Sequence, residues 1–164
     1  MKLDASIYNG EPQPSSDLVA VIDRTARIEE WMTRIIFAYC SPRLEARTFM
    51  WSMVLDTSVM STGAKAKVVM AIALEMNFDL EKNAIHKVIE LRNAFAHHAT
   101  DANFTIGTDN EGETIFYSEF RILRASGKLD KKKRHEAFEE FNHAYFIAKA
   151  SLIELTKLTA PFVS

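Results

Sequence analysis

Residues 61–98 read STGAKAKVVMAIALEMNFDLEKNAIHKVIELRNAFAHH, and this stretch decides the fold class. Apolar residues recur every three or four positions on both sides of Asn77-Phe78-Asp79, which is a typical turn sequence. The spacing predicts one amphipathic helix over about 65–76 and a second over about 80–98. Helices joined by so short a turn are expected to pack antiparallel in a bundle.

The residues before this stretch predict two more helices. Residues 1–14 contain one glycine and two prolines and show little periodicity, so we interpret them as an N-terminal arm. Ser15 or Ser16 is expected to cap a long first helix that ends at Ser41-Pro42. Its apolar stripe is Leu18, Val21, Thr25, Ile28, Met32, Ile35 and Tyr39. The second helix is predicted from about Leu44 to Thr57, with Leu44, Thr48, Trp51 and Leu55 on one face.

The residues after this stretch change character. Apolar residues flank the turn sequence Asp109-Asn110-Glu111-Gly112, which predicts a small β-hairpin within 101–123. Asp130 is expected to cap a final long helix, because apolar residues from Phe138 to Leu155 again follow the helical spacing. The predicted fold is therefore mainly α, an antiparallel bundle of about five helices with a small β-hairpin before the last helix. Residues 15–164 are expected to form a single domain.

The composition of the chain limits the classes of function that the protein can have. The 164 residues carry a formal net charge of −2, which argues against the broad basic surface of a general nucleic-acid-binding protein but leaves room for a local basic patch. Cys40 is the only cysteine, so no intrachain disulfide forms, and we expect it to be a buried small side chain. No signal peptide or membrane span is apparent in the sequence, so we expect a cytoplasmic protein without membrane contact.

Arg92 breaks the apolar register of the helix over 80–98. The apolar positions of this helix follow the register Ile85, Val88, position 92, Phe95 and Ala99. An apolar residue is therefore expected at position 92, but the sequence has Arg92 there. An arginine in a core seam either extends its head to solvent or meets a polar partner, because an unpaired buried charge is strongly disfavoured. A carboxylate of another helix, such as Glu30 or Asp56, is one candidate partner.

Polar residues beside Arg92 make this helix end a candidate site. Asn93 and His97 are four residues apart and share a helix face, Arg92 lies between them and the apolar stripe, and His98 lies on the other flank. A helix C-terminus favours a protonated histidine, because of the dipole and the unsatisfied carbonyls there. The candidate site residues are Arg92, Asn93, His97 and His98.

The arginine, the following polar residue and the histidine after four intervening residues resemble the signature of the HEPN superfamily. His98 provides a second permitted spacing. More narrowly, residues 61–98 resemble the mannitol operon repressor (MltR-like) family, with its glycine-lysine helix start and its helix end of the form R-N-x-F-A-H. The flanking helices agree with that family only in their architecture.

The resemblance implies two alternative functions. In the first, the chain is a metal-independent endoribonuclease in which His97 acts as acid or base, Arg92 holds the phosphate and Asn93 orients the histidine or the RNA. Such sites are usually completed across a homodimer. In the second, the chain is a non-catalytic regulator that acts through protein partners. Neither alternative calls for a cofactor or a metal.

Two other features have simpler interpretations. The run Lys131-Lys132-Lys133-Arg134-His135 opens the predicted last helix, where cations oppose the helix dipole. It is either a phosphate-binding patch or, as we favour, a solvated run balanced by Glu136, Glu139 and Glu140. Ser61-Thr62-Gly63 lacks the first glycine and the Lys-Ser/Thr ending of a phosphate loop, so an ordinary helix start is expected.

Overall fold

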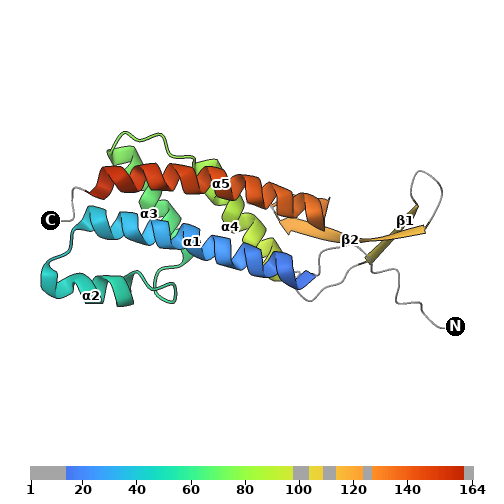
Figure 1. The fold of residues 1–164 in the computed structure, drawn as a ribbon, viewed down its shortest axis with the longest axis horizontal. Helices are drawn as coiled ribbons and strands as arrows, with labels where there is room; N and C mark the ends of the chain where they lie inside the picture. The colour runs from blue at the N-terminus through green and yellow to red at the C-terminus, as the bar shows by residue number, and fades with distance from the viewer. Residues whose placement is uncertain (1–13, 98–103, 109–113, 124–126, 161–164) are drawn as a thin grey trace.

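The computed structural model describes residues 14–97, 104–108, 114–123 and 127–160, and describes side chains over 17–97, 120–122 and 127–160. Its elements are the helices α1 (Pro14–Cys40), α3 (Thr62–Glu75), α4 (Lys82–His97) and α5 (Arg134–Thr159), the short helical pieces η2 (Leu44–Ala46), α2 (Arg47–Phe49) and η3 (Met50–Val54), and the strands β1 (Phe104–Thr108), β2 (Thr114–Leu123) and β3 (Leu129–Lys133). Figure 1 shows the long helices packed together, with the strands at one end. The predicted mainly α bundle with a hairpin before the last helix is confirmed.

Side-chain contacts fix the directions of the long helices. Arg134 at the start of α5 lies 3.6 Å from Asp17 at the start of α1, and Arg24 donates to Asn142 farther along both helices. α1 and α5 therefore run in the same direction, away from the sheet (Figure 1). The backbone N–H of Glu81, just before α4, instead donates to Ser151 late in α5, so α4 runs antiparallel to α5.

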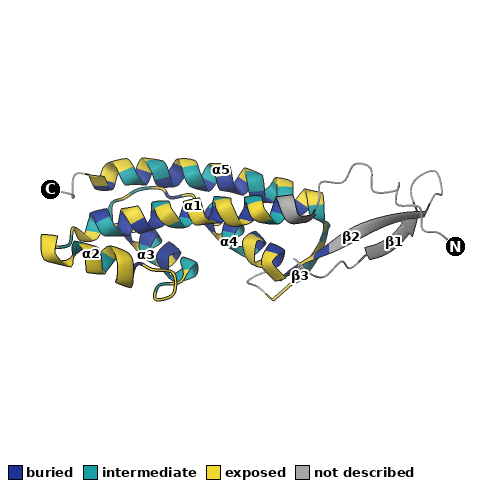
Figure 2. Cartoon of the chain, turned by 60° about the horizontal axis from the view of Figure 1, so that its bottom comes forward, coloured by how far each residue is buried: buried dark blue, intermediate teal, exposed yellow. Residues whose placement is uncertain are grey.

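The core is made of the stripes that the spacing predicts. Figure 2 shows the dark, buried side of each long helix turned toward its neighbours. On α1, the predicted positions Val21, Ile28, Met32 and Ile35 have no exposed surface. On α5, Phe141, Ala148, Leu152 and Leu155 are likewise fully buried, as the three-and-four spacing predicts.

The turn between α3 and α4 is confirmed at Asn77. This residue has φ of 53°, a left-handed conformation that asparagine tolerates better than most residues. Its N–H donates to the carbonyl of Leu74, and the N–H of Phe78 donates to that of Ala73 at 2.8 Å. These two bonds satisfy the last carbonyls of α3 in a Schellman arrangement, which ends the helix where the sequence predicts a turn.

The first two predicted helices differ from the structure in detail. α1 begins at Pro14, so Ser15 and Ser16 lie inside the helix rather than capping it, which agrees with the preference of proline for a first helical turn. The predicted helix from Leu44 is a succession of short pieces that ends at Val54. Leu44 is 75% exposed and Trp51 is 42% exposed, so the predicted face buries only Leu55.

The β-hairpin is confirmed, and a third strand joins it. β1 and β2 pair antiparallel from Phe104↔Ser118 to Thr108↔Thr114, and the turn between them falls outside the described residues. β3 pairs with β2 from Leu123↔Leu129 to Glu119↔Lys133. The prediction that Asp130 caps the last helix is therefore wrong, because Leu129–Lys133 extends β2 into a three-stranded sheet and α5 begins only at Arg134.

Cys40 is exposed at the last residue of α1, so the prediction of a buried thiol is wrong. The helix ends there because Ser41 takes φ of 40° before Pro42. Within the described residues, no helix combines the length and the apolar composition needed to cross a membrane.

Candidate functional site

The helix register places Arg92 at the surface. On α4, the fully buried positions are Ile85, Val88, Leu91 and Phe95. Leu91 fills the core position that the sequence register assigns to residue 92, so the prediction of an arginine in the core seam is wrong. The register steps by three from Val88 to Leu91 and then by four to Phe95, which places Arg92 at the edge of the buried face.

Arg92 and Asn93 interact with each other. A guanidinium nitrogen of Arg92 donates to the side-chain oxygen of Asn93 at 3.1 Å, and both residues are exposed. The alternative in which Arg92 pairs with Glu30 or Asp56 is not found. Glu30 accepts from Arg34, and Asp56 accepts from Ser58.

His97 is the last residue of α4 and is exposed. It shares the outer face of the helix with Asn93, as predicted. Arg92 and His97 are five positions apart, so they point roughly 140° away from each other around the helix and lie about 7.5 Å apart along its axis. His98, the fourth candidate residue, lies outside the described residues.

An aromatic contact holds this end of α4 against the sheet. Phe95, two residues before His97, lies with its ring centroid 4.5 Å from that of Phe120 on β2, and both are buried. The guanidinium of Arg134 lies 5.2 Å from the Phe95 ring centroid, on the way to its ion pair with Asp17. The cation therefore connects the starts of α1 and α5 to the end of α4.

A second cluster of charges ties α4 to β3 and α5. Glu140 on α5 accepts from Lys132 of β3 at 2.7 Å and from Lys87 of α4 at 3.1 Å. Burial alone would raise the pKa of the Glu140 carboxyl, but the hydrogen bonds from the two lysines outweigh burial and lower that pKa below its ordinary value. The ionised carboxylate is therefore part of the folded structure.

This cluster predicts a loss of stability in acid. A carboxyl whose pKa is lowered by folding stabilises the protein above its unfolded-state pKa, and this contribution disappears as the pH falls through the lowered pKa. Glu140→Gln is expected to lower the free energy of unfolding by about 1–2 kcal/mol at pH 7. The deficit relative to wild type should shrink as the pH falls below the ordinary value of 4.5. Urea unfolding across that range measures it.

The matched control is Glu139→Gln, because Glu139 is the exposed neighbour on the same helix. Its free energy of unfolding should differ from wild type by less than about 0.5 kcal/mol at every pH. Equal deficits for the two variants would contradict the assignment to Glu140.

The groups at the end of α4 suit phosphate chemistry. A guanidinium donates to phosphate oxygens in pairs, and an imidazole accepts and returns protons near neutral pH. Because the two groups diverge on one helix, a single chain presents them as separate contacts rather than as a closed pocket. The arrangement offers charge stabilisation and proton transfer, with Asn93 beside Arg92 to limit the movement of the guanidinium.

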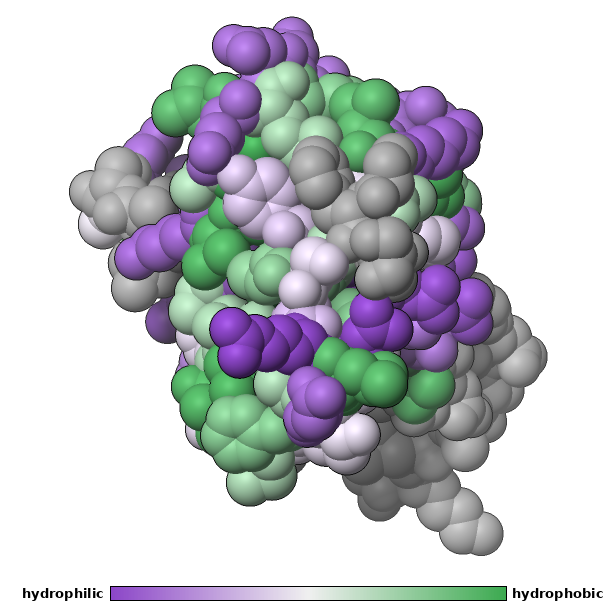
Figure 3. Space-filling view, turned by 90° about the vertical axis from the view of Figure 1, so that its left-hand side faces the viewer, coloured by the Kyte–Doolittle hydropathy of each residue, from purple (hydrophilic) through white to green (hydrophobic). Residues whose placement is uncertain are grey.

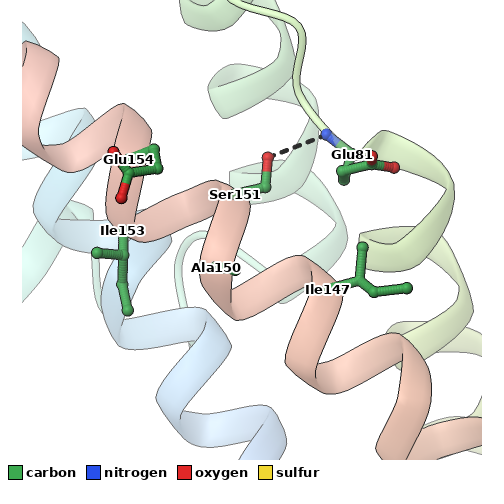
Figure 4. Close-up of a pocket in the computed structure, with 6 residues that line it drawn as sticks. All are labelled: Glu81, Ile147, Ala150, Ser151, Ile153 and Glu154. Atoms are coloured by element: carbon green, nitrogen blue, oxygen red, sulfur yellow. Dashed lines mark hydrogen bonds between the residues drawn. The ribbon is translucent and has the colours of Figure 1, made fainter.

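Two hollows of the described surface lie elsewhere. One of 610 Å³ lies along α5 beside the start of α4, at the opposite end of that helix from His97 (Figure 4), and is lined by Glu81, Ile147, Ala150, Ser151, Ile153 and Glu154. The other lies between α1 and η3, where Trp51 and Leu55 meet Glu29 and Asp56. Neither is lined by a candidate site residue. In the described ranges, no group of three or more His, Cys, Asp or Glu side chains is placed to hold a metal ion.

Comparisons of the chain with protein-family models, with curated proteins and with solved structures find no match. The candidate site therefore rests on its own residues and geometry. Sequence reasoning missed Arg134 and Asp17, which help to place the site. No pattern in the run Lys131–Arg134 marks alternate residues as inward-facing, because a strand with a single apolar residue, Leu129, gives no period-two signal.

Proposed function

We propose that this chain is a HEPN-like, RNA-directed domain and a metal-independent endoribonuclease. In this proposal, His97 acts either as the base that takes the proton of the ribose 2′-OH or as the acid that donates a proton to the leaving 5′-oxygen, and Arg92 stabilises the charge that develops on the phosphate. Asn93 holds Arg92. The proposed setting is the cytoplasm, with two copies of the chain forming a homodimer.

The observation that carries the proposal is the open position of Arg92. A structural arginine would be covered and held by a carboxylate, whereas Arg92 is exposed and bonds only to its neighbour Asn93 in the described part of the chain. His97 is also exposed, about one and a half turns farther along the helix. Their divergence on the helix supports completion of the site by a second chain, because a partner's histidine can approach the phosphate that Arg92 holds.

The test is cleavage of RNA in the presence of EDTA. The proposed chemistry uses the 2′-oxygen as nucleophile, so the expected products carry 2′,3′-cyclic phosphate ends and form without added metal. Substrates with 2′-O-methyl riboses should remain intact. Products with 3′-hydroxyl ends, or activity that EDTA abolishes, would contradict the proposal.

A second candidate function, a regulator that acts through protein partners, is favoured by a different surface. The segment 44–59 exposes five large apolar side chains: Leu44, Phe49, Trp51, Met53 and Val59. α2 lies at the end of the molecule away from the sheet (Figure 1). Figure 3 shows this end, where hydrophobic residues lie among hydrophilic ones. Exposed apolar side chains grouped in this way are typical of protein contacts. Absence of cleavage by folded, dimeric protein across several RNAs would favour this candidate.

A further inference from the structure

The short helix α3 covers only part of one side of α1. Thr62 and Lys65, at the start of α3, donate to Glu29 at 2.9 Å and 2.6 Å, so α3 first meets α1 near its middle. Figure 1 likewise shows α3 beside the half of α1 that is farther from the sheet. Ile22 lies seven residues before Glu29 and therefore on the same side of α1, about two turns closer to the sheet. This half of the side is open, since Val19 is 65% exposed and Ile22 is 50% exposed.

The end of α4 lies at the same level as this open half of α1. Arg134 pairs with Asp17 at the start of α1 and lies over the ring of Phe95 near the end of α4. Because one side chain reaches both, the first turns of α1 and the last turns of α4 are neighbours. Figure 2 shows both at the end of the molecule that carries the sheet.

The side of α4 that is turned away from α5 carries Ile89 and Arg92. Lys87 marks the opposite side, because it bonds to α5 at 3.1 Å, and Arg92 and Ile89 lie about 140° and 200° around the helix from it. Ile22 is turned away from α5 in the same way, since it lies about 160° around α1 from Arg24, which donates to α5. These side chains form the open face, which consists of Val19, Ile22, Ile89 and Arg92.

The chain before α1 has the position and the length to cover the open face. Residues 1–13, which lie outside the described residues, join α1 at Pro14, at the sheet end of the molecule. Asn9-Gly10 is a turn sequence, which favours a reversal of the chain just before the helix. The distance from the start of α1 to the level at which α3 begins is about 22 Å, and eight extended residues reach about 26 Å. Residues 1–8 are therefore long enough to run back along the open face.

The composition of residues 1–8 matches the open face. Leu3, Ala5 and Ile7 are separated by single polar residues, and although this run is too short to predict a strand, it gives an extended chain one apolar side. Asp4 is the carboxylate of this segment. Arg92 is exposed, and its bond to the neighbouring asparagine engages one nitrogen of a guanidinium that has five donors in all.

We propose that residues 1–8 dock on the open face of the same chain, with Asp4 paired to Arg92. Removal of Val19, Ile22 and Ile89 from water drives the docking, and the ion pair sets its register. The functional consequence rests on the proposed function. A carboxylate and a phosphate use the same guanidinium donors, so the docked segment competes with RNA for Arg92 and RNA has to displace it.

A nitroxide spin label tests the docking in the full chain. The label is attached at a polar position of the segment in the variant Cys40→Ser/Ser6→Cys, because Cys40 is exposed and would otherwise be labelled as well. Amide NMR signals of residues 18–26 and 89–96 should lose intensity, because docking brings the label close to both. Signals of residues 150–159, at the far end of α5, should keep their intensity.

Variants on both sides of the contact should release the segment. Leu3→Ser/Ile7→Ser removes the apolar side of the segment and should restore the lost signals. Ile22→Ser should do the same from the open face. The matched control is Leu74→Ser, which changes a more exposed apolar side chain on α3 and should leave the signal loss as it is. Circular dichroism checks that each variant is folded.

Competition for Arg92 is measured with a fluorescent 2′-O-methyl oligouridylate, which the proposed chemistry cannot cleave. Asp4→Asn should bind this probe roughly two- to fivefold more tightly than wild type, because the segment loses an exposed ion pair. The matched control is Asp79→Asn, which makes the same charge change at an exposed position before the other end of α4 and should bind as wild type does.

Each outcome supports or overturns the inference. Undiminished amide signals over the open face would overturn it, as would a signal loss that survives Leu3→Ser/Ile7→Ser. Equal affinities of Asp4→Asn and Asp79→Asn would overturn the pairing with Arg92. Signal loss in a mixture of spin-labelled and separately isotope-labelled protein would mean that the face receives the segment of a second copy, which overturns docking within one chain.

Cleavage of natural RNA by wild type is measured separately, so that this inference and the proposed function fail independently. Docking without any cleavage removes the nuclease proposal alone. Cleavage by a wild-type chain whose amide signals are undiminished removes only this inference.

Discussion

Replacing His97 with alanine is expected to lower the rate of RNA cleavage by about 10²–10⁴-fold, which is the usual contribution of a positioned acid or base. Replacing Arg92 with alanine is expected to cost about 10²–10³-fold, because the charge on the phosphate loses a stabilising cation. Both side chains are exposed, so neither change removes core packing. Single-turnover cleavage in EDTA, with saturating enzyme, measures both effects on the chemical step.

His86 provides the matched control. It is an exposed histidine on the same helix, about three turns before His97. His86→Ala should cleave RNA at the wild-type rate. The free energy of unfolding of all three variants should lie within about 0.5 kcal/mol of the wild-type value. Residual cleavage that is the same in His97→Ala, Arg92→Ala and wild type would indicate a contaminating nuclease and would remove both residues from the proposed mechanism.

Much of the fold was predictable because its long helices bury one face each. The three-and-four spacing of apolar residues in α1, α4 and α5 predicted most of the buried positions. Asn77 predicted the turn, in which a residue with a left-handed conformation is needed. The register error at Arg92 has a local cause. Leu91 and Arg92 are adjacent in sequence, so the helical spacing allows either of them at the edge of the buried face. Packing against the neighbouring elements determines which of the two is covered.

The third strand could not be predicted from local pattern. Residues 129–133 contain one apolar residue, and they become a strand because β2 extends beyond β1 and presents unpaired backbone groups to them. The candidate site was predicted as a set of neighbours along a helix, and the structure places Arg92, Asn93 and His97 at its surface. The support that Arg134 gives to this helix end depends on contacts between residues distant in sequence.

Lys65 shows the same limit most clearly. Lysine is almost never fully buried without a partner, and no local pattern near the start of α3 identifies one for Lys65. In the structure Lys65 is 2% exposed, and its ammonium lies 2.6 Å from the carboxylate of Glu29 on α1. Thr62 donates to the same carboxylate at 2.9 Å, and Thr57 also donates to it. Burial would raise the pKa of Glu29, but these hydrogen bonds and the ammonium lower it overall.

Lys65→Met is therefore expected to lower the free energy of unfolding by about 3–5 kcal/mol, because it leaves the partly buried carboxylate of Glu29 without its counter-ion. Urea unfolding measures the loss. The matched control is Lys67→Met, since Lys67 is exposed on the same helix and its replacement should change stability by less than about 0.5 kcal/mol. Equal losses for Lys65→Met and Lys67→Met would contradict the assignment.

The double variant Lys65→Met/Glu29→Leu separates the cost of an unpaired charge from the value of the pair. Replacing both members of a buried ion pair with apolar residues is often nearly neutral, because neither charge is then left without a partner. The double variant should therefore recover most of the stability that Lys65→Met loses, although Thr57 and Thr62 give up an acceptor. A double variant as unstable as the sum of its single variants would mean that Lys65 and Glu29 contribute independently.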